Sequence, residues 1–267
     1  MVAPDAKPVT VPDFQAAKSR GSRLTMVTCY DYATSRLLDA TSVDALLVGD
    51  SLGMVIQGHP NSLSVTLDDV VYHTRCVARG AARALIVADM PFLTYQINAD
   101  EALRHAGRLI QEGGAHAVKL EGGRRMAATI ERIVAADIPV MGHVGLTPQS
   151  IRRLGGFRVQ RDEAAIFEDA RAVADAGAFA VVLECIPAGL ARRITESLPI
   201  PTIGIGAGAG CDGQVLVLHD LLGMFDDLQP RFVKRYAELG QTLRAAVQQY
   251  CEEVRAGKFP GPEHEFR

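Results

Sequence analysis

The feature that most constrains the fold of this chain is a series of eight short apolar runs rich in valine, isoleucine and alanine. Their apolar character is continuous, not alternating, which is typical of strands buried on both faces of a parallel sheet. They recur about every 27 residues, roughly the length of a strand followed by a helix. The runs are residues 24–29, 45–49, 84–88, 115–120, 138–142, 178–183, 200–205 and 214–218.

The segments between several of these runs have the periodicity of helices. Residues 101–112 and 124–136 each repeat apolar side chains every three or four positions, which predicts one buried helical face. Asp162 occupies an N-cap position for a third helix, which Gly177 closes. Strand–helix units in such a series predict an α/β fold, a (β/α)8 TIM barrel.

We expect one barrel domain over residues 1–267, with a short N-terminal extension (1–23) and a long C-terminal helix at about 231–256. One interval fits poorly, because only about eight residues separate the seventh and eighth runs, which is too short for a full helix. An open, doubly wound sheet therefore remains the alternative architecture.

Charge and cysteine content exclude several classes of protein. The 28 Lys and Arg residues and the 31 Asp and Glu residues give a net charge of −3, whereas nucleic-acid binding or a polybasic membrane anchor requires a basic excess. Residues 1–23 contain no apolar signal core, and no apolar run approaches the ~18 residues that cross a bilayer. The five cysteines contain no C-x-x-C pair, so we expect a reduced, cytoplasmic protein without a disulfide framework.

Ionisable residues lie where the predicted strands end. In a parallel barrel the active site lies at the C-terminal ends of the strands, and six of the eight runs end in such residues. Aspartates at these positions also serve as helix caps. Capping does not explain Lys119, Glu121 and Glu184, because these residue types are neither good caps nor common in buried strands.

Asp50, Asp89 and Glu121 follow three neighbouring predicted strands and would converge on one sector of the barrel mouth. Carboxylates placed so close together repel one another unless a cation lies among them. A set of oxygen ligands without a His–Cys cluster favours Mg²⁺. Lys119 shares a strand face with Glu121 and is suited to bind an anionic substrate, although it would also serve simply to neutralise Glu121.

Glu184 lies across the predicted mouth from these carboxylates, among apolar residues that would partly desolvate it and make it a stronger base. The alternative is a structural salt bridge to an arginine. Together the groups predict that a 2-oxo acid chelates a metal ion while Glu184 removes the adjacent proton. The glycine-rich residues 204–210 lead into a strand and not a helix, so a dinucleotide loop is rejected in favour of a tight turn.

Several stretches resemble the ketopantoate hydroxymethyltransferase family, and the resemblance extends from about residue 25 to residue 266. The matching stretches include 28–33 (TCYDYA), 47–54 (LVGDSLGM), 88–92 (ADMPF), 115–123 (AHAVKLEGG), 142–150 (GHVGLTPQS) and 183–187 (LECIP). This resemblance implies a barrel of the phosphoenolpyruvate/isocitrate-lyase type, assembled as a homodecamer. It also implies Mg²⁺ and transfer of a hydroxymethyl group from 5,10-methylenetetrahydrofolate to 3-methyl-2-oxobutanoate, giving 2-dehydropantoate in pantothenate biosynthesis.

The resemblance further assigns roles to residues of this chain. Asp50 and Asp89 match metal ligands of the family, and Glu121 matches a third, outer-shell acidic residue. Asp50, Ser51, Asp89 and Lys119 match contacts to the 2-oxo acid, and Glu184 matches the proton acceptor. The folate site has no local signature in the sequence.

Three other functions share some of these features. Another Mg²⁺-dependent lyase or aldolase that enolises a 2-oxo acid would use the same barrel, but such relatives typically carry a K-K-C-G-H loop, which this chain lacks. Lys119 would act as a Schiff-base nucleophile in a different class of enzyme. A non-catalytic binding barrel would need no opposed base, which leaves Glu184 without a role.

Overall fold

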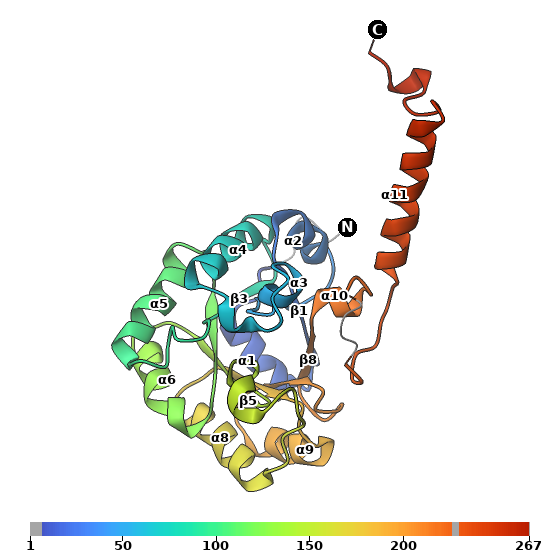
Figure 1. Ribbon diagram of the computed structural model, residues 1–267. Helices are drawn as coiled ribbons and strands as arrows, with labels where there is room; N and C mark the ends of the chain where they lie inside the picture. Colours follow the sequence, from blue (N-terminus) through green and yellow to red (C-terminus); the bar gives the residue numbers. More distant parts are fainter. Residues whose placement is uncertain (1–6, 226–229, 267) are drawn as a thin grey trace. The chain divides into compact units, whose positions relative to one another are not determined.

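A computed structural model describes residues 7–225 and 230–266 of the 267-residue chain. The chain divides into two compact units, Met1–Leu216 and Val217–Arg267, and each is described by itself. The first unit contains eight parallel strands that pair in chain order and close into a barrel (Figure 1). The barrel prediction is therefore confirmed over the open sheet.

The strands of the barrel correspond one to one with the eight apolar runs. They are β1 (Leu24–Thr28), β2 (Ala45–Val48), β3 (Leu85–Asp89), β4 (Ala117–Glu121), β5 (Val140–Gly145), β6 (Ala180–Glu184), β7 (Thr202–Ile205) and β8 (Gly213–Leu216). The ends differ from the predicted runs by a few residues. The largest difference is at β5, which continues through Gly145 because it still pairs with β6 there.

Helices surround the barrel in Figure 1, and their apolar faces pack on its outer surface. The longer ones are α2 (Tyr32–Asp39), α4 (Leu67–Gly80), α5 (Ala99–Gln111), α6 (Ala127–Val134), α8 (Glu163–Asp175) and α9 (Ala188–Ser197). Asp162 caps α8 as predicted, since its side chain accepts a hydrogen bond from the N–H of Ala165. The predicted helix at 124–136 begins with a 3-10 turn (Arg124–Met126) and continues as α6.

Side chains alternate along each strand between the outer core and the barrel interior. In β3, Ile86 and Ala88 belong to the outer core with the helices, whereas Leu85 and Val87 belong to the interior cluster. Residues two apart on a strand share a face, so Asp89 follows Val87 into the interior. This alternation is what directs polar residues at the strand ends toward the barrel axis.

The N-terminal segment contributes a helix, α1 (Val11–Arg20), to the end of the barrel where the strands begin. Thr10 and Asp13 form a capping box at its start. Phe14 is fully buried in the interior cluster and packs edge-on against Phe179, the residue before β6, at 5.8 Å between ring centroids. The other end of the barrel, where the strands finish, is thus left for the site.

The short connection between β7 and β8 contains no helix, in agreement with the length of the predicted interval. Residues 206–212 form turns in which Gly206 and Gly208 adopt positive φ angles of 63° and 80°. The carboxylate of Asp212 accepts a hydrogen bond from the N–H of Thr202 at 2.9 Å. The barrel still closes, because β8 pairs with β7 on one side and with β1 on the other.

The second unit contains α10 (Leu218–Leu221) and α11 (Leu239–Arg255). The predicted start of the long helix at about residue 231 is wrong by eight residues. The N–H groups of Tyr236 and Leu239 donate to the carbonyls of Leu221 and Leu222 instead of forming helical bonds. The single-domain organisation over 1–267 stays a prediction.

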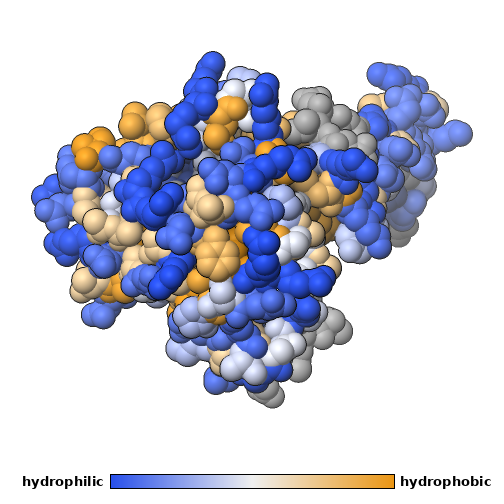
Figure 2. All heavy atoms as spheres, turned by 90° about the horizontal axis from the view of Figure 1, so that it is seen from below, coloured by the Kyte–Doolittle hydropathy of each residue, from blue (hydrophilic) through white to orange (hydrophobic). Residues whose placement is uncertain are grey.

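Hydrophilic residues cover most of the molecular face in Figure 2, with hydrophobic residues in smaller patches. None of the helices within residues 7–225 and 230–266 is long and apolar enough to cross a membrane.

Candidate active site

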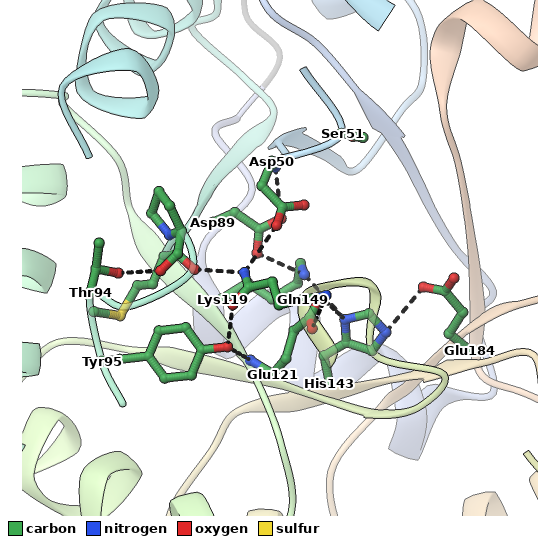
Figure 3. Close-up of polar contacts among 12 residues, drawn as sticks. Asp50, Ser51, Asp89, Thr94, Tyr95, Lys119, Glu121, His143, Gln149 and Glu184 are labelled. Atoms are coloured by element: carbon green, nitrogen blue, oxygen red, sulfur yellow. Dashed lines mark hydrogen bonds and ion pairs between the residues drawn. The ribbon is translucent and has the colours of Figure 1, made fainter. Parts of the chain in front are cut away.

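The predicted site residues come together at the C-terminal end of the barrel (Figure 3). Asp50 follows β2, and Ser51 comes directly before the short helix α3 (Leu52–Val55). Asp89 ends β3, while Lys119 and Glu121 lie in β4 two residues apart. Glu184 ends β6. All the residues selected from the sequence therefore lie at the strand ends, as a barrel enzyme requires.

Asp50, Asp89 and Lys119 form one polar group. The Asp89 Oδ1 atom lies 2.7 Å from Lys119 Nζ, and its Oδ2 atom accepts a hydrogen bond from the N–H of Asp50 at 3.1 Å. Both side chains of the ion pair are about 95% buried. Ser51 lies beside this group, with its hydroxyl 2.8 Å from the hydroxyl of Tyr30.

Gln149 connects the two predicted acidic residues that do not touch Lys119 directly. Its side-chain amide donates to Asp50 Oδ2 at 2.9 Å and to the carbonyl of Met90 at 3.0 Å. Its backbone N–H donates to Glu121 Oε2 at 3.0 Å. The Tyr95 hydroxyl fixes the amide by donating to Gln149 Oε1 at 2.6 Å. One residue therefore orients both carboxylates.

A chain of contacts crosses the barrel mouth from Lys119 to Glu184 through His143 (Figure 3). Lys119 Nζ lies 3.3 Å from His143 Nδ1, and His143 Nε2 lies 3.1 Å from Glu184 Oε2. Glu121 Oε1 lies 3.5 Å from the same Nδ1 atom. A lysine ammonium only donates hydrogen bonds, so Nδ1 accepts and the ring proton lies on Nε2, directed at Glu184.

The charge states of these groups follow from burial and from one another. Burial would lower the pKa of Lys119, but the carboxylates of Asp89, Glu121 and Asp50 raise it above its ordinary value, so the ammonium stays charged. Burial lowers the pKa of His143 and the Lys119 charge lowers it further, which keeps the imidazole neutral. Burial raises the pKa of Glu121 well above its usual range, with the Asp50 charge adding to the shift.

The donor set suits a divalent cation held by two aspartates. Burial raises the pKa of Asp89 to about 7, the Lys119 ammonium opposes this shift, and the Asp50 carboxylate adds to it. Three buried acidic groups (Asp50, Asp89 and Glu121) thus face one lysine, and a cation would remove the excess negative charge. Mg²⁺ takes only one or two protein carboxylates and keeps several waters.

Glu121 has other contacts than the two aspartates. No group of three or more His, Cys, Asp or Glu side chains capable of holding a metal ion occurs in the part of the chain that the structure describes. The Glu121 carboxylate faces Gln149 and His143. Direct coordination by Asp50 and Asp89, with Glu121 in the outer shell, stays a prediction.

Sequence reasoning missed His143, Gln149 and Tyr95 as site residues. His143 directly follows the fifth predicted strand (138–142), and its position two residues after the interior residue Met141 was the signal that places it inside the barrel. Gln149 lies in a short 3-10 helix (Pro148–Ser150), far along the chain from Asp50, to whose carboxylate it donates. Tyr95 lies in the loop after β3, and its hydroxyl accepts from the backbone N–H of Glu121. No local pattern in the sequence marks either residue.

Comparison with known proteins now identifies the family. A family model described as ketopantoate hydroxymethyltransferase matches residues 8–262. The chain belongs to this family. Proteins named 3-methyl-2-oxobutanoate hydroxymethyltransferase from Pelobacter propionicus and Moorella thermoacetica are each 59% identical to it, over 97% of this chain and 98% of the relative. The relative from Syntrophus aciditrophicus is 56% identical, over 97% of this chain and 96% of its own length.

Solved structures with lower sequence identity share the fold. A phosphonopyruvate hydrolase complexed with oxalate and Mg²⁺ aligns with a TM-score of 0.64 at 13% identity, over 94% of this chain and 89% of that chain. A 2,3-dimethylmalate lyase, described as a member of the PEP mutase/isocitrate lyase superfamily, aligns with a TM-score of 0.62 at 17% identity, over 97% and 89% of the two chains. These likenesses show the fold, an eight-stranded α/β barrel.

Proposed function

We propose that this site removes a proton from 3-methyl-2-oxobutanoate and transfers to the resulting carbanion a hydroxymethyl group from 5,10-methylenetetrahydrofolate. The product would be 2-dehydropantoate, in the biosynthesis of pantothenate. Membership of the ketopantoate hydroxymethyltransferase family supports the activity. The observation that carries the mechanism is the placement of Asp50, Asp89 and Lys119 on one side of the barrel mouth, with Glu184 joined to them through His143.

Asp50 and Asp89 would hold Mg²⁺, because their carboxylates are buried, close together and only partly compensated by Lys119. Glu121 would contact a water molecule in the outer shell of the ion and would not bind the ion directly. When bound, Mg²⁺ would polarise the keto oxygen of the substrate and stabilise the negative charge that develops there.

Lys119 would bind the carboxylate of the 2-oxo acid. Its ammonium is held charged and buried by Asp89, so it is a fixed positive charge that needs no reorganisation when the substrate arrives. The Ser51 hydroxyl, oriented by Tyr30, would donate a further hydrogen bond to the substrate. These contacts would place C3 of the substrate toward the opposite side of the mouth.

Glu184 would take the proton from C3. Its side chain is 14% exposed, and its Oε2 atom lies 3.1 Å from Nε2 of the neutral His143. Water would add to the methylene carbon of the folate, whose bonds to N5 and N10 both break as the nitrogens leave as amines, which gives a one-carbon unit at the oxidation level of formaldehyde. The C3 carbanion would form its bond to that carbon, and the oxygen from water would take up a proton and become the hydroxyl group. A positioned base of this kind contributes ~10²–10⁴-fold to a rate.

Proton NMR of 3-methyl-2-oxobutanoate in D₂O tests the proposal, with protein and Mg²⁺ present and folate absent. We expect the C3 proton to exchange for deuterium, because proton removal does not require the co-substrate. If the C3 signal persists with protein present as it does without protein, the proposed mechanism is wrong. Adding 5,10-methylenetetrahydrofolate then separates hydroxymethyl transfer from the alternative, an enolising lyase or aldolase that would cleave a carbon–carbon bond.

The Schiff-base alternative is disfavoured by the surroundings of Lys119. A nucleophilic lysine must lose its proton, whereas the carboxylates around Lys119 raise its pKa. Borohydride reduction in the presence of substrate would trap a covalent adduct at Lys119 if that alternative were correct. We expect no adduct.

We also infer that copies of this chain associate, as a homodecamer in line with the family resemblance. Helix α11 carries an apolar stripe of five side chains that are 38–57% exposed, namely Leu239, Leu243, Val247, Tyr250 and Val254. A second copy covering this stripe would remove it from water. Sedimentation analysis tests the inference, and a monomer that persists at micromolar protein would contradict it. The cytoplasmic location expected from the sequence stays a prediction.

A further inference from the structure

A pocket of about 360 Å³ is lined by the end of β5, by the segments that follow β4 and β5, and by one residue of α8. Its lining includes Gly123, Arg124, Arg125, Gly145, Thr147 and Arg153. None of these residues takes part in the contacts that join Asp50 to Glu184. The pocket is therefore a separate subsite that the mechanism above does not use.

The pocket is continuous with the catalytic residues along the chain. Its lining begins one residue after Glu121 and resumes one residue after His143. Gly145, another lining residue, pairs with Glu184 in the barrel register. A chain covers at most ~3.6 Å per residue, so Arg125 begins within about 15 Å of Glu121. This distance is short enough for one extended ligand to reach from the pocket to the catalytic centre.

The charge of the pocket is positive and partly uncompensated. Arg124 Nε lies 3.1 Å from the Asp169 carboxylate, which neutralises one of the three guanidinium groups. Arg125 donates only to the neutral hydroxyl of Ser150, at 3.2 Å. Within residues 7–225 and 230–266, Arg125 and Arg153 form no ion pair with a carboxylate. Two positive charges therefore remain for a ligand.

Glycine at two lining positions is required by close packing and keeps the pocket wall free of side chains. A Cβ atom at Gly123 would lie 2.1 Å from the Cβ atom of Asp169. At Gly145, where φ is 93°, a Cβ atom would lie 2.3 Å from the carbonyl oxygen of Glu184. Because Gly145 has no side chain, its backbone packs closely against the backbone of Glu184, the catalytic base, and the pocket stays open.

We propose that this pocket binds the glutamyl carboxylates of the folate co-substrate, an inference that rests on the proposed function. The one-carbon group of the folate must reach the substrate at the centre of the mouth, so its acidic end must lie at the periphery. That end of the monoglutamate carries two carboxylates, which match the two uncompensated arginines in number and charge. Guanidinium groups bind carboxylates in a bidentate manner, which gives both affinity and orientation.

The 2-oxo acid is not the expected ligand of this pocket. Its single carboxylate already has Lys119, and its keto group must lie near Asp50 and Asp89 for proton removal. A free anion, such as inorganic phosphate or a dicarboxylate acting as an effector, has the same chemistry as the glutamyl end. The experiment below separates these two sources.

The test compares Arg153→Gln and Arg125→Gln with a matched control, Arg152→Gln. Arg152 lies beside Arg153 on the short helix α7 (Ile151–Leu154), is exposed, and does not line the pocket. We expect the KM for 5,10-methylenetetrahydrofolate to rise about tenfold in each pocket variant, the scale of a lost charge-assisted contact. The control variant should keep the KM of the unaltered protein.

A co-substrate without the glutamyl group, 5,10-methylenetetrahydropteroate, identifies the part of the folate that is bound. We expect the pocket variants and the unaltered protein to show equal KM values for it, because it lacks the carboxylates. A tenfold effect that persists with the pteroate would overturn the assignment to the glutamyl end. An unchanged KM for the folate in both pocket variants would also overturn the assignment, with or without an effect of phosphate or succinate on the turnover of these variants.

The two proposals fail in different ways. Deuterium exchange at C3 in the unaltered protein tests the proposed function without folate and without the pocket. Exchange and turnover in the unaltered protein, combined with unchanged folate KM values in both pocket variants, would leave the proposed function standing and remove this inference.

Discussion

Replacing Glu184 with glutamine removes the negative charge while keeping the shape of the side chain and its contact with His143. The amide oxygen of the introduced glutamine can occupy the place of the present Oε2 atom, which lies 3.1 Å from His143 Nε2. The substitution replaces a charged oxygen by a neutral one at a partly exposed position, so the free energy of unfolding should fall by less than about 1 kcal/mol. The amide has no basicity, however, and cannot take the C3 proton.

The expected loss of rate is therefore much larger than the loss of stability. Removing a positioned general base slows proton transfer by ~10²-fold or more, which corresponds to a barrier higher by about 2.7 kcal/mol. Proton NMR in D₂O measures the exchange rate at C3 directly and without folate, so product release does not obscure the result. Urea unfolding of the same protein shows whether the fold is intact.

Glu163→Gln is a suitable control because it makes the same chemical change away from the site. Glu163 pairs with Arg193 at 2.7 Å on the surface, where both side chains are at least half exposed. We expect it to exchange C3 protons at the rate of the unaltered protein. An exchange rate in Glu184→Gln within a factor of two of the unaltered protein would refute the assignment of Glu184 as the base.

Four further predictions concern the metal, the buried ion pair, a buried carboxylate and a thiol. Chelation should abolish C3 exchange and added Mg²⁺ should restore it, and full exchange in a demetallated sample would contradict the metal assignment. Lys119→Met should lower the free energy of unfolding by about 3–5 kcal/mol, because it strands the buried Asp89 charge, and a loss below 1 kcal/mol in urea unfolding would contradict this. Burial raises the pKa of Asp220 to about 6. The stability that the protonated Asp220 carboxyl group gives to the folded protein is therefore present below about pH 4 and lost as the pH rises through 6. Asp220→Asn should thus stabilise the protein by about 1–2 kcal/mol at pH 8, after allowance for partial exposure, and by much less at pH 4, with pH-dependent melting as the check. Burial raises the pKa of Cys185 to about 12, so iodoacetamide at pH 8 should leave it unlabelled by mass spectrometry, and rapid labelling would show this prediction to be wrong.

The barrel and the position of its site were predictable because both depend on local periodicity. Continuous apolar runs marked all eight strands, and the polar residue at the end of a run marked the catalytic edge. The start of α11 was not predictable in this way. The apolar stripe continues upstream to Phe232, but the backbone there bonds to residues 221–223 instead of to itself. Side-chain periodicity does not report where backbone hydrogen bonds go.

His143 shows why a residue can be noticed in the sequence and still not be assigned a role. Its position at a strand end suggested the site, but its function depends on which groups lie on each side of the ring. The register pairs β5 with both β4 and β6, and this places Glu121 beside His143 and Glu184 beside Gly145. A neutral imidazole between a lysine and a carboxylate can make a favourable contact with both groups in only one tautomer. That tautomer can be assigned only when both neighbours of the ring are known.

Gln149 was beyond prediction for a different reason. It lies 99 positions from Asp50 and 28 from Glu121, yet it donates one hydrogen bond to each carboxylate. An amide suits this position because it adds no charge to a group that already has three acidic residues and one lysine. A carboxylate there would repel Asp50, and an apolar side chain would leave a buried Asp50 oxygen without its donor. The choice of glutamine thus follows from the electrostatics of the assembled site, which exists only after the loops behind β3 and β5 have met.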